Sequence, residues 1–127
     1  MACPYFLPVT PLAGGAPASP LGAVFAGKCA AVPDADPGEV LLRTGCNQGY
    51  ARAFCPHAMV SPVDAARFRI KSHRASVIEV AWSYEKDHHP VSVGVLTLRE
   101  APVGSTPLEA QARACIAVYL RRKGMNW

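Results

Sequence analysis

Hydrophobic and polar side chains alternate along the second half of the chain. Residues 67–71 alternate basic and apolar side chains, which is typical of a half-buried strand. Residues 91–98 are apolar and rich in β-branched side chains, and a polar turn at residues 86–90 precedes them. The strongest alternation lies in residues 76–85, where one face carries Ile78, Val80, Trp82 and Tyr84. The pattern predicts a three-stranded antiparallel sheet whose last two strands form a β-hairpin.

A helix is predicted after these strands. Thr106 is a suitable N-cap, Pro107 fits the first helical position, and Glu109 lies where the helix dipole favours an acid. The helix should run to about Lys123 and end at Gly124. We expect its apolar face to cover the sheet, so that residues 65–127 form an α+β unit. That face consists of Leu108, Ala112, Cys115, Ile116, Tyr119 and Leu120.

The first half of the chain has a different character. Residues 1–64 contain nine of the 12 prolines and seven of the ten glycines. Few long helices or strands tolerate that density, so turns, short strands and one helical turn are expected. A chain of 127 residues has the length of one domain. We therefore expect a single domain, residues 1–127, in which 1–64 wraps a site and 65–127 holds the regular elements.

Four of the five cysteines lie in the loop-rich half: Cys3, Cys29, Cys46 and Cys55. The fifth, Cys115, falls on the apolar face of the predicted helix, where a free thiol behaves as a small hydrophobe. Four thiols are the right number for a tetrahedral or cubane metal site. They also occur in the segment that most needs an additional constraint. These observations predict that the four cysteines ligate a metal centre.

Three kinds of cysteine site compete. Two disulfides fit poorly with an odd number of cysteines and with a start that lacks a secretory signal. Structural zinc usually takes ligands in close C-x2-4-C pairs, which this spacing does not offer. A [4Fe–4S] cluster is larger than one ion, so its ligands can come from four separate loops. Cys3 and Cys55 are each followed by proline, as is the last cysteine of bacterial ferredoxin motifs. The sequence favours the cluster, with zinc as the alternative.

Residues next to these cysteines are candidates for surrounding the metal. Gly49 would let backbone amides approach a sulfide closely. Four aromatic residues could shield the site from water, although each is equally consistent with ordinary core packing: Tyr5, Phe6, Tyr50 and Phe54.

The first 70 residues also resemble a small group of bacterial four-cysteine proteins. The resemblance is carried by Ala2-Cys3-Pro4-Tyr5-Phe6, Pro20-Leu21-Gly22, Gly27-Lys28-Cys29, and Cys46-Asn47-Gln48-Gly49-Tyr50-Ala51-Arg52 with Cys55. It reinforces the grouping of the four cysteines, leaves Cys115 outside it and implies no particular activity.

The histidines indicate no separate site. His88 and His89 fall at a predicted hairpin tip, where solvated polar residues belong, and His73 falls in a predicted basic turn. His57 lies two residues after Cys55 and could replace one thiolate, although a polar loop role is simpler. A reactive Cys46 or Cys55 near His57 would instead indicate an enzyme.

Charge and hydropathy limit the classes of partner that the sequence predicts. The net charge of +4 is too small to predict nucleic-acid binding by itself. The basic residues near the end suit a helix C-terminus. No apolar run is long enough for a transmembrane helix. We expect a cytoplasmic iron–sulfur protein that exchanges electrons with a redox partner protein or senses redox state. The alternative is a zinc-stabilised protein-interaction module without redox activity.

Overall fold

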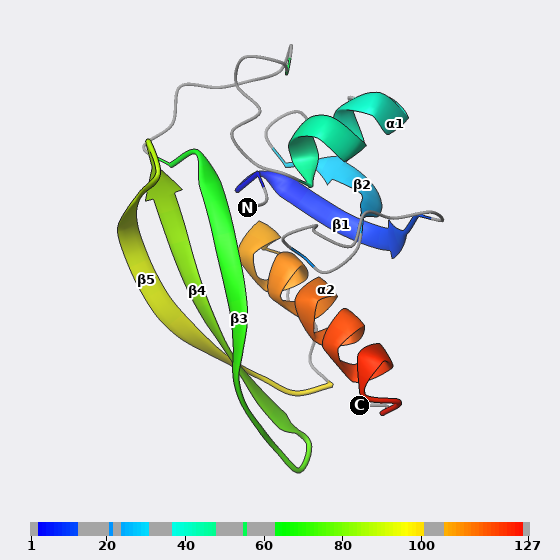
Figure 1. Ribbon diagram of the computed structural model, residues 1–127, viewed down its shortest axis with the longest axis vertical. Helices are drawn as coiled ribbons and strands as arrows, with labels where there is room; N and C mark the ends of the chain where they lie inside the picture. The colour runs from blue at the N-terminus through cyan, green and yellow to red at the C-terminus, as the bar shows by residue number, and fades with distance from the viewer. Residues whose placement is uncertain are drawn as a thin grey trace.

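Helix α2 (Pro107–Arg122) lies between a two-stranded sheet and a three-stranded sheet in the computed structural model (Figure 1). The structure describes residues 3–12, 21, 24–30, 37–47, 55, 63–100 and 106–125. The larger sheet has the order β3-β4-β5 and both of its strand pairs are antiparallel. The predicted α+β class is confirmed.

The three predicted strands are present; the first and third are longer than the sequence pattern indicated, and the second is shifted by one residue. They are β3 (Ala65–Arg74), β4 (Val77–Lys86) and β5 (His89–Leu98). Alternation in β3 is interrupted because the register shifts between Ile70 and Ser72, and strand pairing resumes beyond this irregularity. His73 therefore lies in β3, and its prediction as a turn residue was wrong.

The hairpin between β4 and β5 turns more tightly than predicted. Asp87 and His88 have φ angles of 50° and 65°. Two consecutive residues with positive φ are typical of a type I′ turn, whose twist matches that of the strands it joins. His89 and Pro90, which the sequence pattern assigned to the turn, already belong to β5.

The predicted apolar face of β4 points toward the core. Ile78 and Val80 are fully buried, and Trp82 and Tyr84 pack against the same core while remaining partly exposed. Trp82 pairs with Gly94 of β5, and a Cβ atom at Gly94 would lie 2.6 Å from the indole ring. The strand partner of Trp82 must therefore be a residue without a side chain, because the ring occupies that space.

The first half forms short elements, as its composition predicts. Strands β1 (Phe6–Pro11) and β2 (Phe25–Cys29) pair antiparallel. A helical turn, α1 (Gly38–Leu41), continues into the π-helical turn η1 (Leu42–Cys46). This half contributes to the hydrophobic core, although the sequence suggested that it mainly wraps a site. Its buried residues belong to the same hydrophobic cluster as α2 and the larger sheet: Phe6, Leu21, Phe25, Leu42 and Cys46.

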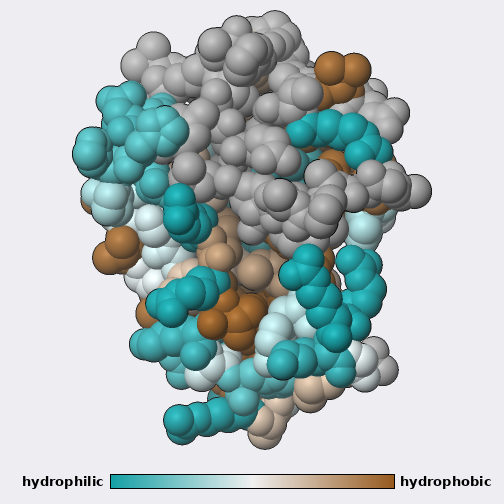
Figure 2. All heavy atoms as spheres, viewed as in Figure 1, coloured by the Kyte–Doolittle hydropathy of each residue, from teal (hydrophilic) through white to brown (hydrophobic). Residues whose placement is uncertain are grey.

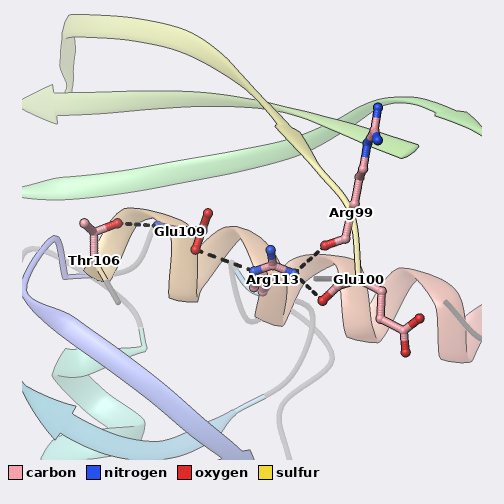
Figure 3. Close-up of polar contacts among 5 residues, drawn as sticks. All are labelled: Arg99, Glu100, Thr106, Glu109 and Arg113. Carbon is pink, nitrogen blue, oxygen red and sulfur yellow. Dashed lines mark hydrogen bonds and ion pairs between the residues drawn. The ribbon is translucent and has the colours of Figure 1, made fainter. Parts of the chain in front are cut away.

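Helix α2 begins and ends as predicted. The Thr106 hydroxyl accepts a hydrogen bond from the Glu109 amide at 3.2 Å, and Pro107 is the first helical residue (Figure 3). At the other end, Gly124 has a φ of 66° and donates its amide to Arg121. The amide of Met125 reaches back to Leu120, which completes a Schellman motif.

Arg113 connects α2 to the chain that leaves β5. Its Nη1 donates to the carbonyl oxygens of Arg99 at 2.7 Å and Glu100 at 3.4 Å (Figure 3). Its Nε also lies 3.6 Å from the carboxylate of Glu109, one turn earlier. The arginine therefore fixes the start of the helix against the end of the sheet.

Burial of α2 extends beyond the one predicted face. The larger sheet covers the predicted apolar side, where Ala112, Ile116 and Leu120 are buried. Gln111, Ala114 and Val118 are buried as well. The prediction was too narrow because it did not anticipate that β1 packs against the same helix. Within the described part of the chain, no helix is long and apolar enough to cross a membrane.

We expect Thr106→Ala to lower the free energy of unfolding by about 1 kcal/mol, because the Glu109 amide loses its cap. Urea denaturation would measure the change. Thr106→Ser is the matched control, because serine retains the hydroxyl and should remain close to wild type. Equal losses in both variants would contradict the capping role.

Candidate metal centre

Cys3 begins a tight turn that leads into β1. The amide of Phe6 donates to the Cys3 carbonyl at 3.1 Å and closes the turn over Pro4 and Tyr5. The backbone amides of Tyr5 and Phe6 also hydrogen-bond to the Cys3 thiol, which lowers its pKa, but the larger effect of burial raises it overall. Amide bonds of this kind also stabilise metal-bound thiolates and tune cluster potentials.

The backbone brings Cys29 and Cys46 beside this turn. Cys29 ends β2 and pairs with Phe6, and the following amide, that of Ala30, donates to the Tyr5 carbonyl at 2.7 Å. Cys46 ends η1, and its carbonyl accepts a hydrogen bond from the Cys3 amide at 3.0 Å. Three separate segments thus deliver their cysteines to one end of the small sheet.

The charge of Cys55 also acts on the thiols of Cys3 and Cys46. Burial raises the pKa of the Cys46 thiol to about 12, with further contributions from the negative charges of Cys3, Cys55 and Cys29. Cys29 and Cys55 likewise raise the pKa of Cys3. Because such effects require nearby charges, the thiols of Cys3 and Cys46 lie within electrostatic range of each other and of Cys29 and Cys55. The use of these four cysteines as metal ligands stays a prediction.

Cys115 stands apart from this group. It is half-buried on α2 and packs against the hydrophobic core. Burial raises the pKa of its thiol to about 11, and the nearby positive charge of Arg122 partly opposes the rise. No other cysteine contributes to the pKa of Cys115. Its environment is that of a packing residue.

Gln111 of α2 holds the Cys3 turn from inside the protein. The side chain is fully buried, and its Nε2 donates to the carbonyl of Cys3 at 2.7 Å and to that of Phe6 at 2.8 Å. Gln111 thus fixes both ends of the turn that carries the first cysteine. The sequence pattern missed this residue, because it lies beside the predicted apolar face of α2 and its partner strand was not predicted to be there.

Asn47 performs the equivalent role beside Cys46. Its fully buried side chain accepts from the Phe25 amide and donates to the Phe25 carbonyl, both at 2.9 Å. It also donates to the Leu42 carbonyl at 2.7 Å. The side-chain amide therefore pairs with β2 as a peptide group would, and it fixes η1 against that strand. Its position directly after Cys46 is the only sequence signal that singles it out.

Only two of the five residues that we predicted to surround the metal are described by the structure. Phe6 is 1% exposed and belongs to the hydrophobic core, while Tyr5 is half-buried in the Cys3 turn. Gly49, Tyr50 and Phe54 lie outside the described residues, so their predicted roles stay predictions. His57 also lies outside them.

The remaining histidines lie away from the cysteine group. His88 and His89 are exposed at the β4–β5 hairpin, as predicted. His73 is partly buried, and its Nδ1 lies 3.0 Å from the hydroxyl of Tyr119 on α2. That pair helps to join the sheet to the helix.

All five cysteines are free thiols. Among the described residues, no three His, Cys, Asp or Glu side chains are arranged to hold one metal ion. The chain matches no protein-family model, no curated protein and no solved structure. The interpretation of this centre therefore depends on its own geometry.

The raised pKa of Cys46 predicts an alkaline loss of stability in the metal-free protein. The folded state retains this proton more strongly than the unfolded chain, whose thiol titrates near 9. The contribution is therefore complete below about pH 9 and is lost as pH rises toward 12. Urea denaturation under reducing conditions should show this decline, and Cys46→Ala should weaken it. An unchanged pH profile in the variant would contradict the assignment.

We expect Gln111→Met to destabilise the protein by roughly 1–3 kcal/mol, because two backbone carbonyls lose a buried donor. The two residues have similar helix propensities, so the change isolates the lost hydrogen bonds. Alkylation followed by peptide mapping should show that Cys3 reacts faster while Cys115 reacts at the wild-type rate. Equal acceleration at both thiols would indicate general loosening instead.

Proposed function

We propose that this protein binds a [4Fe–4S] cluster through Cys3, Cys29, Cys46 and Cys55 and functions in one-electron transfer or redox sensing. The observation that carries the proposal is the convergence of four thiols from four separate segments. Their charges act on one another, whereas Cys115 remains outside the group. The donor set contains only sulfur, which is the ligation that such clusters prefer.

The sequence spacing of the cysteines supports a cluster over a single ion. A four-iron cube holds its ligands farther apart than one zinc ion does and can take them from four separate loops. The chain also lacks the close cysteine pairs of most structural zinc sites.

The local backbone suits a thiolate ligand. Cys46 is buried, and its high pKa means that the metal-free thiol is protonated at neutral pH. A bound metal would reverse that preference, because its positive charge stabilises the thiolate form. The amides of Tyr5 and Phe6 already point at the Cys3 sulfur, where they would stabilise its negative charge. A bound cluster would supply a one-electron couple.

Partial exposure of the site supports electron exchange with another protein. Cys3, Cys29 and Cys55 are half-buried rather than fully enclosed, so the centre lies close to the surface. Four cysteine ligands would leave no iron open to substrate, which favours electron transfer or sensing over catalysis. We assign this function to the cytoplasm, where thiols remain reduced, with a redox protein as partner.

A reactive-thiol enzyme is less well supported. A nucleophilic cysteine needs a lowered pKa at neutral pH, whereas burial and neighbouring charges raise that of Cys46. The zinc-stabilised interaction module remains the alternative that metal analysis distinguishes.

Anaerobically purified protein should be coloured and contain about four irons and four sulfides per chain. Cys→Ser replacement at each of the four positions should remove the metal. Cys115→Ala is the matched control, and it should retain the metal and cost about 1 kcal/mol of stability. Iron and sulfide analysis, visible absorption and urea denaturation would measure these outcomes.

Three results would contradict the proposal. Zinc without iron or sulfide would select the interaction module. Colourless protein without metal, in which one thiol alkylates much faster than the others, would support a reactive cysteine. Metal loss from Cys115→Ala would show that the ligand set is wrong.

A further inference from the structure

The face of the larger sheet that points away from α2 carries exposed apolar side chains. Val91, Val93 and Val95 of β5 are 55%, 70% and 45% exposed. A sheet face in contact with water is normally polar, so a row of exposed valines is unusual. Figure 2, viewed as in Figure 1, shows hydrophobic surface at the left margin, where β5 lies.

Strand register assembles these valines into a trough. Residues opposite one another on paired strands share a face. One row across the sheet is Arg67, Ser83 and Val93, and the next is Arg69, Ala81 and Val95. These two rows line a trough of about 640 Å³, which we call the outer trough, and the row between them, Phe68, Trp82 and Gly94, completes its lining. Its floor consists of the small side chains of β4, its one wall is cationic and its other wall is apolar.

The cationic wall is exposed to solvent. Arg67 forms an ion pair with Glu85 at 3.1 Å but retains 62% exposure of its side chain. Arg69 is exposed and makes no ion pair with any described residue. Glu79 lies one row farther along β4, beyond the trough. The outer trough therefore favours a partner that combines acidic and apolar groups.

The dimensions of the trough suit an α-helix. Neighbouring strands lie about 4.8 Å apart, so the walls on β3 and β5 are separated by about 10 Å. A helix with its side chains is about 10–12 Å wide. Arg67 and Arg69 are spaced by about 6.8 Å along the strand, and two helical residues four positions apart are spaced by about 6 Å. Acidic residues at i and i+4 can therefore meet both arginines.

We propose that the outer trough docks an amphipathic helix of a partner protein, with acidic residues facing Arg67 and Arg69 and apolar residues facing Val93 and Val95. The small residues Ala81 and Ser83 permit close approach of that helix. It would cover the second face of the sheet, as α2 covers the first. The inference does not depend on the metal centre.

Two other occupants fit the trough less well. Single-stranded nucleic acid binds to sheets largely by base stacking on aromatic residues, whereas the two aromatic residues in the lining, Phe68 and Trp82, pack against the hydrophobic core. Face-to-face packing with a second copy would bring together two surfaces that each carry exposed arginines. An amphipathic helix with acidic residues can pair with the arginines of one wall and pack its apolar residues on the valines of the other.

The test uses two synthetic helical peptides and the full-length protein. One peptide carries a leucine row flanked by glutamates at i and i+4, and the other replaces those glutamates with lysines. Fluorescence anisotropy should show binding of the glutamate peptide and much weaker binding of the lysine peptide. Methyl NMR signals of Val93 and Val95 should shift on binding, whereas those of Val9 should not.

Matched charge reversals locate the contact. Arg69→Glu should weaken binding of the glutamate peptide by roughly tenfold or more. Arg74→Glu is the control, because Arg74 is equally exposed on β3 but lies outside the trough, and it should change binding less than about twofold. Thermal denaturation would verify that both variants are folded.

Several results would overturn the proposal. These are failure of the glutamate peptide to bind, equal binding of the lysine peptide, and equal effects of the two charge reversals. Concentration-dependent dimers that Val93→Lys abolishes would assign the face to a second copy. A single-stranded oligonucleotide that displaces the peptide and shifts the same valines would assign it to nucleic acid.

Discussion

Burial of one helix from two sides is the constraint on which this structure depends. The larger sheet covers one side of α2 and the β1–β2 pair contacts another, so both halves of the chain share a single hydrophobic core. Neither sheet has a comparable apolar layer of its own among the described residues. A change that tilts α2 would therefore alter the sheet packing and the turn that carries Cys3 together, because Gln111 connects them.

The connection that Gln111 makes between α2 and the Cys3 turn matters for the cysteine group. Four thiols do not attract one another, and their charges raise the pKa values of Cys3 and Cys46. The arrangement must be maintained by other contacts in the absence of metal. Buried amide side chains provide them, since Gln111 secures the first turn and Asn47 secures η1 against β2. These contacts fix the turn that carries Cys3 and the end of η1 at Cys46 without any metal.

Sequence patterns predicted the regular elements well where those elements depend on interactions between residues close in the sequence. Alternation identified three strands, and Thr106, Pro107 and Gly124 identified the helix ends because capping depends on neighbouring residues. The pattern did not show how far β3 extends, because a bulge interrupts its alternation. It also grouped four cysteines, of which backbone contacts place Cys3, Cys29 and Cys46 at one end of the small sheet. Gln111 escaped prediction because its role depends on packing between segments far apart in the sequence.

The hydrogen bond between Gln111 and Cys3 joins residues 108 positions apart. During synthesis, the three cysteines before Cys55 emerge from the ribosome long before the helix that secures the first of them. The nascent chain therefore carries its thiols without the amide that fixes their geometry, and long-range contacts of this kind form late in folding. Any metal acquired at that stage would meet an incomplete site. A metal of the proposed kind would therefore find the complete site only after α2 has packed against the turn that carries Cys3.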